Sequence, residues 1–281
     1  MARIKYLIAR IIRHFLPESI VTWLLERSWI IKPGLETLSP QQAAERYISR
    51  LKGLHLPMKG KRVMVFGYGG NLSIAAWLLS YGARHVVLIE RTGIPQKHNL
   101  KEIGKQFPQF FMKGSFGSEI NPKYISIFHD DITALAEKNR FAPVDLVLTS
   151  SVYEHLEQPD KVTHALARLT NKNGSHLHFI DLRDHYFKYP FEMLCHSQFV
   201  WKNWLNPTSN LNRYRINDYL TIFKKHFTDT NFITESTDLP NFIKCKDRIR
   251  NEFLSGNDDV DCITQICLTA SKPTIRHNGS S

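Results

Sequence analysis

From Lys61 onward, short apolar runs alternate with longer stretches of helical periodicity. The apolar runs show little alternation with polar residues, which is typical of strands buried on both faces of a parallel sheet. They read RVMVFG, HVVLIE, YISIFHD, VDLVLTS and SHLHFIDL, at residues 62–67, 85–90, 124–130, 144–150 and 175–182. Helices are predicted between them, including residues 72–82 and 159–170. Repeated strand-then-helix units predict an α/β fold built on a doubly wound sheet.

The N-terminal segment has a different pattern, that of an amphipathic helix. Its apolar residues recur at helical spacing, at Ile4, Leu7, Ile8, Ile11, Ile12, Phe15 and Leu16, and Arg3, Lys5, Arg10 and Arg13 flank or oppose them. Such a helix can lie on an anionic membrane, but packing over a core or a partner subunit is the commoner use of this pattern. A second helix is expected over residues 37–54, with Ser39 as N-cap and Pro40 at its first position.

The pattern changes again after the fifth strand. An aromatic-rich stretch is followed by two strand-like runs, at 229–237 and 261–272, with a helix-like run at 241–256 between them. The expected organisation is an N-terminal helical extension, a core, a lid that binds substrate, two strands that complete the sheet, and a tail. These parts cover residues 1–58, 59–182, 183–230, 231–273 and 274–281.

The composition narrows the range of expected binding partners and cellular compartments. The 281 residues carry a net charge of +11, but the basic residues are scattered, without a Lys/Arg block or a zinc-finger spacing. Nucleic-acid binding is therefore not expected. The four cysteines show no CxxC spacing, and no apolar N-terminal run resembles a secretory signal, so we expect a cytoplasmic protein.

Three glycines follow the first strand, at Gly67, Gly69 and Gly70. In a doubly wound sheet, ligands bind at the carboxyl ends of the strands, and glycines there let the backbone turn sharply against a ligand. A dinucleotide fingerprint requires a small residue where this chain has Leu72, which argues against a dehydrogenase. Glu90 ends the second strand, where a carboxylate can accept hydrogen bonds from ribose hydroxyls.

Further motifs follow in a recognisable order: HDDI at 129–132, DLVLTSSVYEHLEQP at 145–159 and LTNKNGSHLHFIDL at 169–182. Together with the glycine turn and Glu90, they resemble the class I S-adenosylmethionine-dependent methyltransferases of the small-molecule type. The resemblance covers roughly residues 59–182. It implies a Rossmann-like sheet of seven mostly parallel strands that ends in an antiparallel pair. It also implies S-adenosylmethionine as cofactor and S-adenosylhomocysteine as product.

Residue by residue, the resemblance implies a cofactor site. The glycine turn would lie against the methionine and ribose, Glu90 would bind the ribose hydroxyls, and Asp131 or its neighbour Asp130 would accept the adenine amino group. The cofactor-binding residues expected are Gly67, Tyr68, Gly69, Gly70, Glu90, Arg91, Asp130, Asp131, Ile132, Ser150 and Ser151. One position departs from the family: Val65 stands where an acidic residue usually helps to hold the methionine ammonium.

Catalytic residues are expected around the fourth and fifth strands. His185 is the first candidate base and His155 the second, with Asp181 beside them. Six residues are expected to bind substrate: Arg183, Tyr186, Trp201, Trp204, Arg213 and Arg215. His176 and His178 share a strand face, but His176 lies at the wrong end of the strand for the active site and no carboxylate is spaced with them. No metal is therefore expected.

The expected reaction is methyl transfer to a small molecule, with oxygen of a hydroxyl or carboxylate as acceptor, on an anionic metabolite or a sugar. The turn TSSVYEH differs from the turns of base-amino and RNA cytosine methyltransferases, and no cysteine precedes Cys195. An RNA substrate is thus the lesser alternative. A catalytically silent methyltransferase-like binding protein is the other, motivated by Val65 and the charge. Membrane contact through the first helix and a homodimer are compatible with the sequence.

Overall fold

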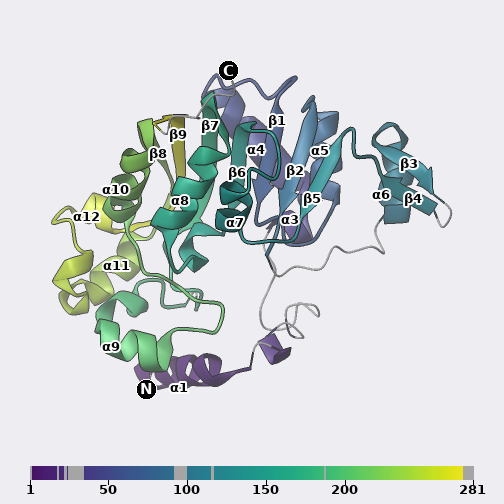
Figure 1. The fold of residues 1–281 in the computed structure, drawn as a ribbon. Helices are drawn as coiled ribbons and strands as arrows, with labels where there is room; N and C mark the ends of the chain where they lie inside the picture. Colours follow the sequence, from purple (N-terminus) through teal and green to yellow (C-terminus); the bar gives the residue numbers. More distant parts are fainter. Residues whose placement is uncertain are drawn as a thin grey trace.

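The computed structural model describes residues 2–17, 19–21, 24, 35–91, 100–114, 117–186 and 188–274. A seven-stranded sheet runs through the centre of the molecule (Figure 1). Its strands, in spatial order, are β5 (Ile125–Phe128), β2 (His85–Ile89), β1 (Arg62–Phe66), β6 (Val144–Ser150), β7 (Thr170–Asp181), β9 (Ile263–Pro273) and β8 (Phe227–Thr237). The pairs from β5 to β7 are parallel, and β9 is antiparallel to both of its neighbours. The predicted sheet is confirmed, including its antiparallel end.

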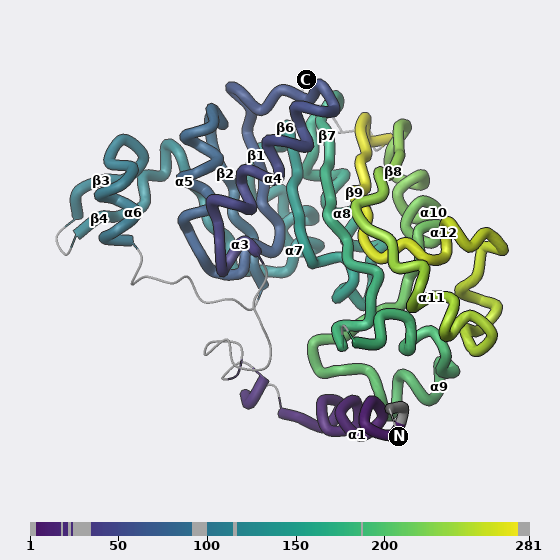
Figure 2. The backbone as a smooth tube through the Cα atoms, turned by 180° about the vertical axis from the view of Figure 1, so that it is seen from behind, coloured from purple at the N-terminus to yellow at the C-terminus, as the bar shows by residue number. Residues whose placement is uncertain are grey.

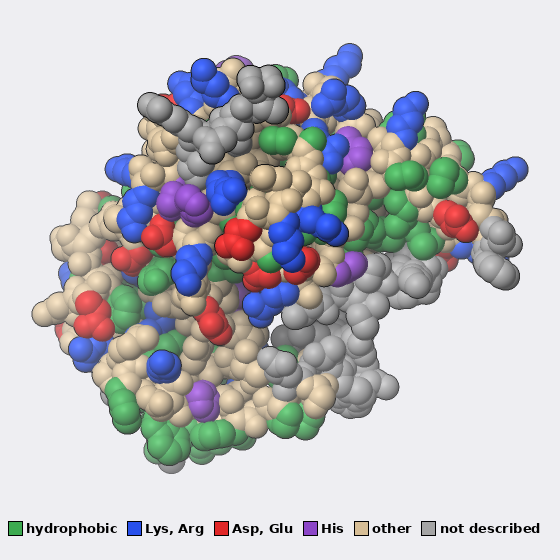
Figure 3. All heavy atoms as spheres, viewed as in Figure 1, with side chains coloured by type: hydrophobic (Ala, Val, Ile, Leu, Met, Phe, Trp, Pro, Cys, Tyr) green, Lys and Arg blue, Asp and Glu red, His purple; other side chains and the backbone are tan. Residues whose placement is uncertain are grey.

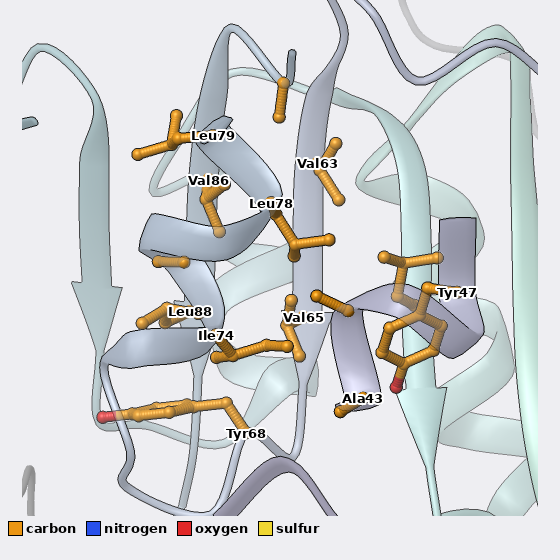
Figure 4. Packing of buried hydrophobic residues seen from close by; sticks show 14 of the residues in the cluster. Ala43, Tyr47, Val63, Val65, Tyr68, Ile74, Leu78, Leu79, Val86 and Leu88 are labelled. Atoms are coloured by element: carbon orange, nitrogen blue, oxygen red, sulfur yellow. The ribbon is translucent and has the colours of Figure 1, made fainter. Parts of the chain in front are cut away.

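Alternate residues of each central strand enter opposite halves of the core. Val63 and Val65 pack under α4 (Pro40–Gly53) and α5 (Ser73–Ser80), as Figure 4 shows, whereas Met64 faces the other side. That side is covered by α7 (Ile132–Glu137), α8 (Pro159–Arg168) and α10 (Ile216–His226). Because both faces are covered, the strands need apolar residues at successive positions, which is the pattern seen in the sequence.

A third hydrophobic cluster lies below the sheet and includes Phe191, Trp201 and Phe242. It is built from short segments after β7 and after β8 (Figures 1 and 2). The segments are η4 (Glu192–Cys195), α9 (Gln198–Val200), η5 (Trp201–Leu205), α11 (Leu239–Cys245), η6 (Lys246–Arg248), η7 (Asn251–Phe253) and α12 (Asp258–Asp261). The region expected as a lid is thus a packed unit with its own small core.

Helix α1 (Ala2–Phe15) packs against this unit through Tyr6, Leu7 and Arg10, and most of its apolar stripe is not part of the contact. Tyr6 and Arg10 are buried, and both contact the buried Asp184: the Tyr6 hydroxyl donates a hydrogen bond to it, and Arg10 forms an ion pair with it. Ile8 and Ile12 are 54% and 56% exposed. The helix thus packs on the protein, as the favoured reading of its pattern expected, but it does so mainly through a buried polar cluster, and most of the stripe stays exposed in the described chain.

Several elements were not predicted. A hairpin of β3 (Phe111–Gly114) and β4 (Gly117–Ile120) projects at one end with α6 (Leu100–Gln106) and η2 (Pro108–Phe110), and α3 (Leu35–Leu38) precedes α4. Pro40 begins α4 as expected, but the Ser39 side chain makes no capping hydrogen bond. The predicted tail lies outside the described residues from position 275 on. None of the helices described is long and apolar enough to cross a lipid bilayer.

Candidate functional site

A cavity of about 730 Å³ opens at the carboxyl ends of β1, β2, β5 and β6. Its size falls in the range of ligand pockets, and its position is where doubly wound sheets bind ligands. Nine of the expected cofactor residues line it: Gly67, Gly69, Glu90, Arg91, Asp130, Asp131, Ile132, Ser150 and Ser151. Tyr68 and Gly70 are buried beside it and are not part of its lining.

The glycine turn has left-handed backbone at Gly67 and Gly69, with φ of 78° and 67°. A Cβ added at Gly67 would lie 2.3 Å from Val152 Cγ2, and one at Gly69 would lie 2.0 Å from the Thr37 hydroxyl. Both positions therefore require glycine, for conformation and for space. Ser151, at the end of β6, is also left-handed with φ of 54°, a conformation that residues with a side chain rarely adopt.

Glu90 is fixed at the rim of the turn. The backbone N–H of Gly69 donates to its Oε2 at 3.1 Å, and the N–H of Arg91 donates to Oε1 at 3.0 Å. A carboxylate oxygen has two lone pairs, so each oxygen can accept a further bond from a ligand in the cavity. This geometry is suited to a pair of ribose hydroxyls.

Asp130 and Asp131 differ in what they already bind. Asp131 is the N-cap of α7, and its Oδ1 accepts bonds from the backbone N–H and the hydroxyl of Thr133. These bonds lower the pKa of Asp131. Asp130 is exposed in the cavity, where its Oδ1 accepts the N–H of Asp131. Either carboxyl retains an oxygen that can accept an amino group, so the choice between them stays open.

Glu36 is a cavity residue that the sequence analysis missed. It belongs to α3, is 2% exposed, and accepts a hydrogen bond of 2.8 Å from the Tyr47 hydroxyl. Burial raises its pKa, against a hydrogen bond from Tyr47 that lowers it. Its neighbour Thr37 donates to the carbonyl of Gly69 at 3.1 Å. Val65, where the family usually has an acidic residue, is a buried core residue of β1. Glu36 nevertheless places a carboxylate in the cavity wall beside the glycine turn.

The two candidate bases lie together, with ring centroids 4.9 Å apart. His155 belongs to η3 (Tyr153–His155) and lines the cavity, whereas His185 lies behind it, outside the lining. Burial lowers the pKa of His155, and burial together with the nearby His155 lowers that of His185 to about 3. Both imidazoles are therefore neutral near pH 7. Glu154 has a carboxylate oxygen within 4.8 Å of a ring nitrogen of each histidine; it is buried, and burial raises its pKa well above the usual range.

Asp181 and Arg183, which were expected to act on the substrate, form an ion pair with each other. Arg183 Nη2 lies 2.6 Å from Asp181 Oδ2, and Arg183 Nε lies 2.9 Å from Oδ1. Each group therefore neutralises the other, and neither lines the cavity. The roles expected for them, Asp181 as a catalytic residue and Arg183 as a substrate-binding residue, do not match this arrangement.

Arg213 and Arg215 were expected to bind an anionic substrate, and the structure gives them other contacts. Arg213 donates to the carbonyls of Met193 and His196 at 3.0 and 2.7 Å. Arg215 donates to the carbonyls of Leu182, Asp261 and Ile263 at 2.9 to 3.1 Å. Both are buried outside the cavity, where they join segments of the lid unit. The expectation is corrected on that ground.

The expected aromatic wall is also elsewhere. Trp201 is buried in the third cluster, where its indole N–H donates to the carbonyl of Leu211 at 3.0 Å. Tyr186 stacks on Tyr189, and Trp204 is 48% exposed on the outer surface beside Phe15. None of them lines the cavity. The lid residues that do line it are polar: Thr208, Ser209 and Asn210.

His176 and His178 form a buried chain of hydrogen bonds. The chain runs from the Thr170 hydroxyl through both rings to the Thr149 hydroxyl, with separations of 2.7, 3.2 and 2.9 Å. Each ring nitrogen therefore has a protein partner. This pair is part of the core between β6 and β7.

The strand order, the antiparallel strand β9 and the glycine turn after β1 together define the class I methyltransferase fold. Solved structures of that fold are similar to the chain. The 1,6-didemethyltoxoflavin-N1-methyltransferase of Burkholderia thailandensis, which holds S-adenosylhomocysteine, is 10% identical with a TM-score of 0.50, over 94% of this chain and 88% of that one. A candidate O-methyltransferase of Nostoc punctiforme is 10% identical with a TM-score of 0.50, over 85% and 59%.

Phosphoethanolamine N-methyltransferase 2 of Haemonchus contortus, solved with S-adenosylmethionine, is 15% identical with a TM-score of 0.49, over 82% of this chain and 53% of that one. No family model matches the sequence. No curated protein matches it either. The likeness therefore defines the fold, and the activity has to be argued from the site.

Proposed function

We propose that the protein is an S-adenosylmethionine-dependent methyltransferase that acts on an oxygen of a small-molecule acceptor. The observation that carries the proposal is the single cavity wall formed by the glycine turn, Glu90, the Asp130–Asp131 pair and Ser150. These groups suit, in order, the methionine and ribose backbone, the ribose hydroxyls, the adenine amino group and the region of the sulfonium. The wall is built from four different strand ends, so its composition is not a by-product of one loop.

The position of Glu36 favours a catalytically active protein over a catalytically silent one. Val65 stands where an acidic residue usually helps to hold the methionine ammonium, and the absence of that acid was the reason to consider a silent relative. We infer that Glu36, buried in the same wall, takes that role. An ammonium partner would offset the cost of keeping this carboxylate ionised away from water.

The acceptor side of the cavity favours a hydroxyl-bearing molecule, such as a sugar, over a strongly anionic one. The arginines expected to bind an anion lie outside, and the lid contributes two hydroxyls and an amide at Thr208, Ser209 and Asn210. Lys161 is the one Lys side chain in the lining. Methyl transfer is an in-line displacement, so the protein has mainly to align the acceptor oxygen with the methyl group and to exclude water.

We also infer a peripheral membrane partner. Ile4, Ile8, Ile12 and Phe15 of α1 are exposed beside Phe199 and Trp204, and Figure 3 shows hydrophobic side chains gathered along this edge of the molecule. We call this set the α1 patch. The segments that carry it, residues 2–15 and 198–205, contain Lys and Arg but no Asp or Glu.

An apolar surface that contains aromatic residues, on two segments whose Lys and Arg residues have no acidic counterpart, fits an anionic lipid surface. A second copy of the chain would place like charges opposite one another, which disfavours a homodimer through this patch. Cytoplasmic location is part of the same proposal, and the four free thiols fit a reducing compartment.

Calorimetry with S-adenosylhomocysteine tests the cofactor site. The wild-type protein should bind it, and Glu90→Ala should weaken binding about 10-fold or more, because a hydrogen bond to a charged group is worth about 1.5–3 kcal/mol. Glu137→Ala is the matched control, since Glu137 is an exposed acid of α7 outside the cavity. Equal affinity in Glu90→Ala and the control would show that the ribose site is elsewhere.

A further inference from the structure

Three side chains that can bind a metal converge beside the cavity. Glu154 and His155 end η3 after β6, and His185 follows β7, so two neighbouring strands bring them together. One potential ligand atom from each lies within 4.8 Å of the other two. A group that surrounds a metal ion at about 2 Å per bond has this spacing.

The carboxylate of Glu154 points to a missing cation. The side chain is 3% exposed, and neither oxygen has a hydrogen-bond partner of normal geometry among the described residues. Buried carboxylates are normally paired or coordinate a metal, because an isolated one is costly to keep in the protein interior. Among the described residues, Arg183 forms an ion pair with Asp181 and Arg10 forms one with Asp184, so the ion pairs of these two arginines are with carboxylates other than Glu154.

His155 is held in the form that a metal ligand requires. Its Nδ1 lies 2.7 Å from the carbonyl oxygen of Asn210 and 3.0 Å from that of Ser209. Carbonyl oxygens only accept hydrogen bonds, so Nδ1 carries the proton and the lone pair is on Nε2. A backbone carbonyl on the second ring nitrogen is the usual arrangement around a metal-bound histidine.

We propose that Glu154, His155 and His185 bind a divalent first-row transition metal, such as Zn²⁺ or Mn²⁺, at the inner end of the cavity. Two imidazoles and one carboxylate leave coordination positions open, as in catalytic sites, whereas Mg²⁺ and Ca²⁺ prefer oxygen ligands. His155 lines the cavity, so an open position can face the acceptor. On this view the two histidines act as ligands and not as bases.

This metal deepens the proposed function, on which its catalytic role rests. The acceptor hydroxyl would bind at an open position, where the metal lowers its pKa and its proton leaves to solvent. The oxygen then forms a bond to the methyl carbon as the bond from that carbon to sulfur breaks. The products are the methyl ether, neutral S-adenosylhomocysteine and one proton.

Metal binding by the full-length protein, without any cofactor, tests the site. Protein treated with a chelator and dialysed should take up one equivalent of Zn²⁺ or Mn²⁺ in calorimetry. Glu154→Gln and His185→Ala should each weaken that binding at least about 10-fold, because even groups that only support a ligand typically contribute about 10- to 100-fold to metal affinity. His129→Ala is the control, since His129 is exposed at the end of β5 and outside the group.

Glu154→Gln keeps the experiment interpretable, because it replaces the buried carboxyl group by an amide of nearly the same volume and should fold without metal. The added metal should raise the melting temperature of wild type and of the control, and leave that of Glu154→Gln unchanged. Absence of metal binding by wild type, or unchanged affinity in folded Glu154→Gln, would overturn the proposal. If S-adenosylhomocysteine still bound in that case, only the metal site would fail. Metal binding without cofactor binding would instead overturn the proposed function.

Discussion

Glu36 shows how one side chain from outside the sheet can complete a site. It comes from α3, ahead of the first strand, yet it lines the cavity and contacts Tyr47. The chain departs from its fold family at Val65, and the structure places a carboxylate in the same wall by another route. No local pattern in the sequence marks Glu36 as a site residue. It lies a few residues before α4, where an acidic residue is common simply because a helix begins there.

Glu36→Gln should therefore weaken binding of S-adenosylhomocysteine about 10- to 100-fold, the worth of a charged hydrogen bond. Binding of 5′-methylthioadenosine, which lacks the amino acid part, should not change. Burial raises the pKa of Glu36, so in wild type the affinity for S-adenosylhomocysteine should fall on acidification at a higher pH than an ordinary carboxyl would cause. Calorimetry with both ligands across pH measures this, and an equal loss for the two ligands would contradict the role.

Substrate residues could not be predicted one by one. Arg213 and Arg215 have the charge expected of anion-binding groups, but their partners are carbonyls distant in sequence, and only the folded lid unit brings these together. The same holds for Glu154, His155 and His185, where the third member follows a different strand from the first two. The expectation of no metal was drawn from His176 and His178 alone. Residues at strand ends were located well, since topology places all parallel strand ends at one edge.

At the scale of elements, α1 shows the limit of periodicity. The hydrophobic pattern predicts the helix correctly, but it does not say which face is buried. Tyr6, Arg10 and the buried Asp184 form a polar cluster that fixes the helix by its less apolar side. Most of the apolar stripe is thereby left on the surface, beside η5.

Sedimentation with vesicles of equal parts phosphatidylglycerol and phosphatidylcholine tests the α1 patch. Wild type should bind and should be released by high salt, because Lys5 and Lys202, which lie on the same segments as the patch, are exposed. Ile8→Glu with Ile12→Glu should abolish binding. Ile243→Glu is the control, an isoleucine of α11 that is 52% exposed outside the patch. Binding that survives the double substitution, or a dimer in light scattering that the double substitution disrupts, would contradict the membrane assignment.

For the whole molecule, the sheet and the order of its strands and helices along the chain could be predicted from the sequence. The strands are apolar at successive positions, which indicates that both faces of the sheet are buried. The antiparallel end of the sheet was predicted from the family resemblance. The hairpin β3–β4 was missed, since its strands are short and mostly exposed and carry little pattern. The lid unit was located but not resolved into elements, because its short helices are held by a small core of their own.

The central claim is that one cavity, at the carboxyl ends of β1, β2, β5 and β6, holds the cofactor with its reactive sulfur toward β6. A crystal structure of the complex with S-adenosylhomocysteine measures this directly. We expect the ribose hydroxyls within hydrogen-bond distance of Glu90, the ammonium on Glu36, and the sulfur facing Ser150 and His155. Density for the ligand outside this cavity, or a ribose that does not contact Glu90, would contradict the claim.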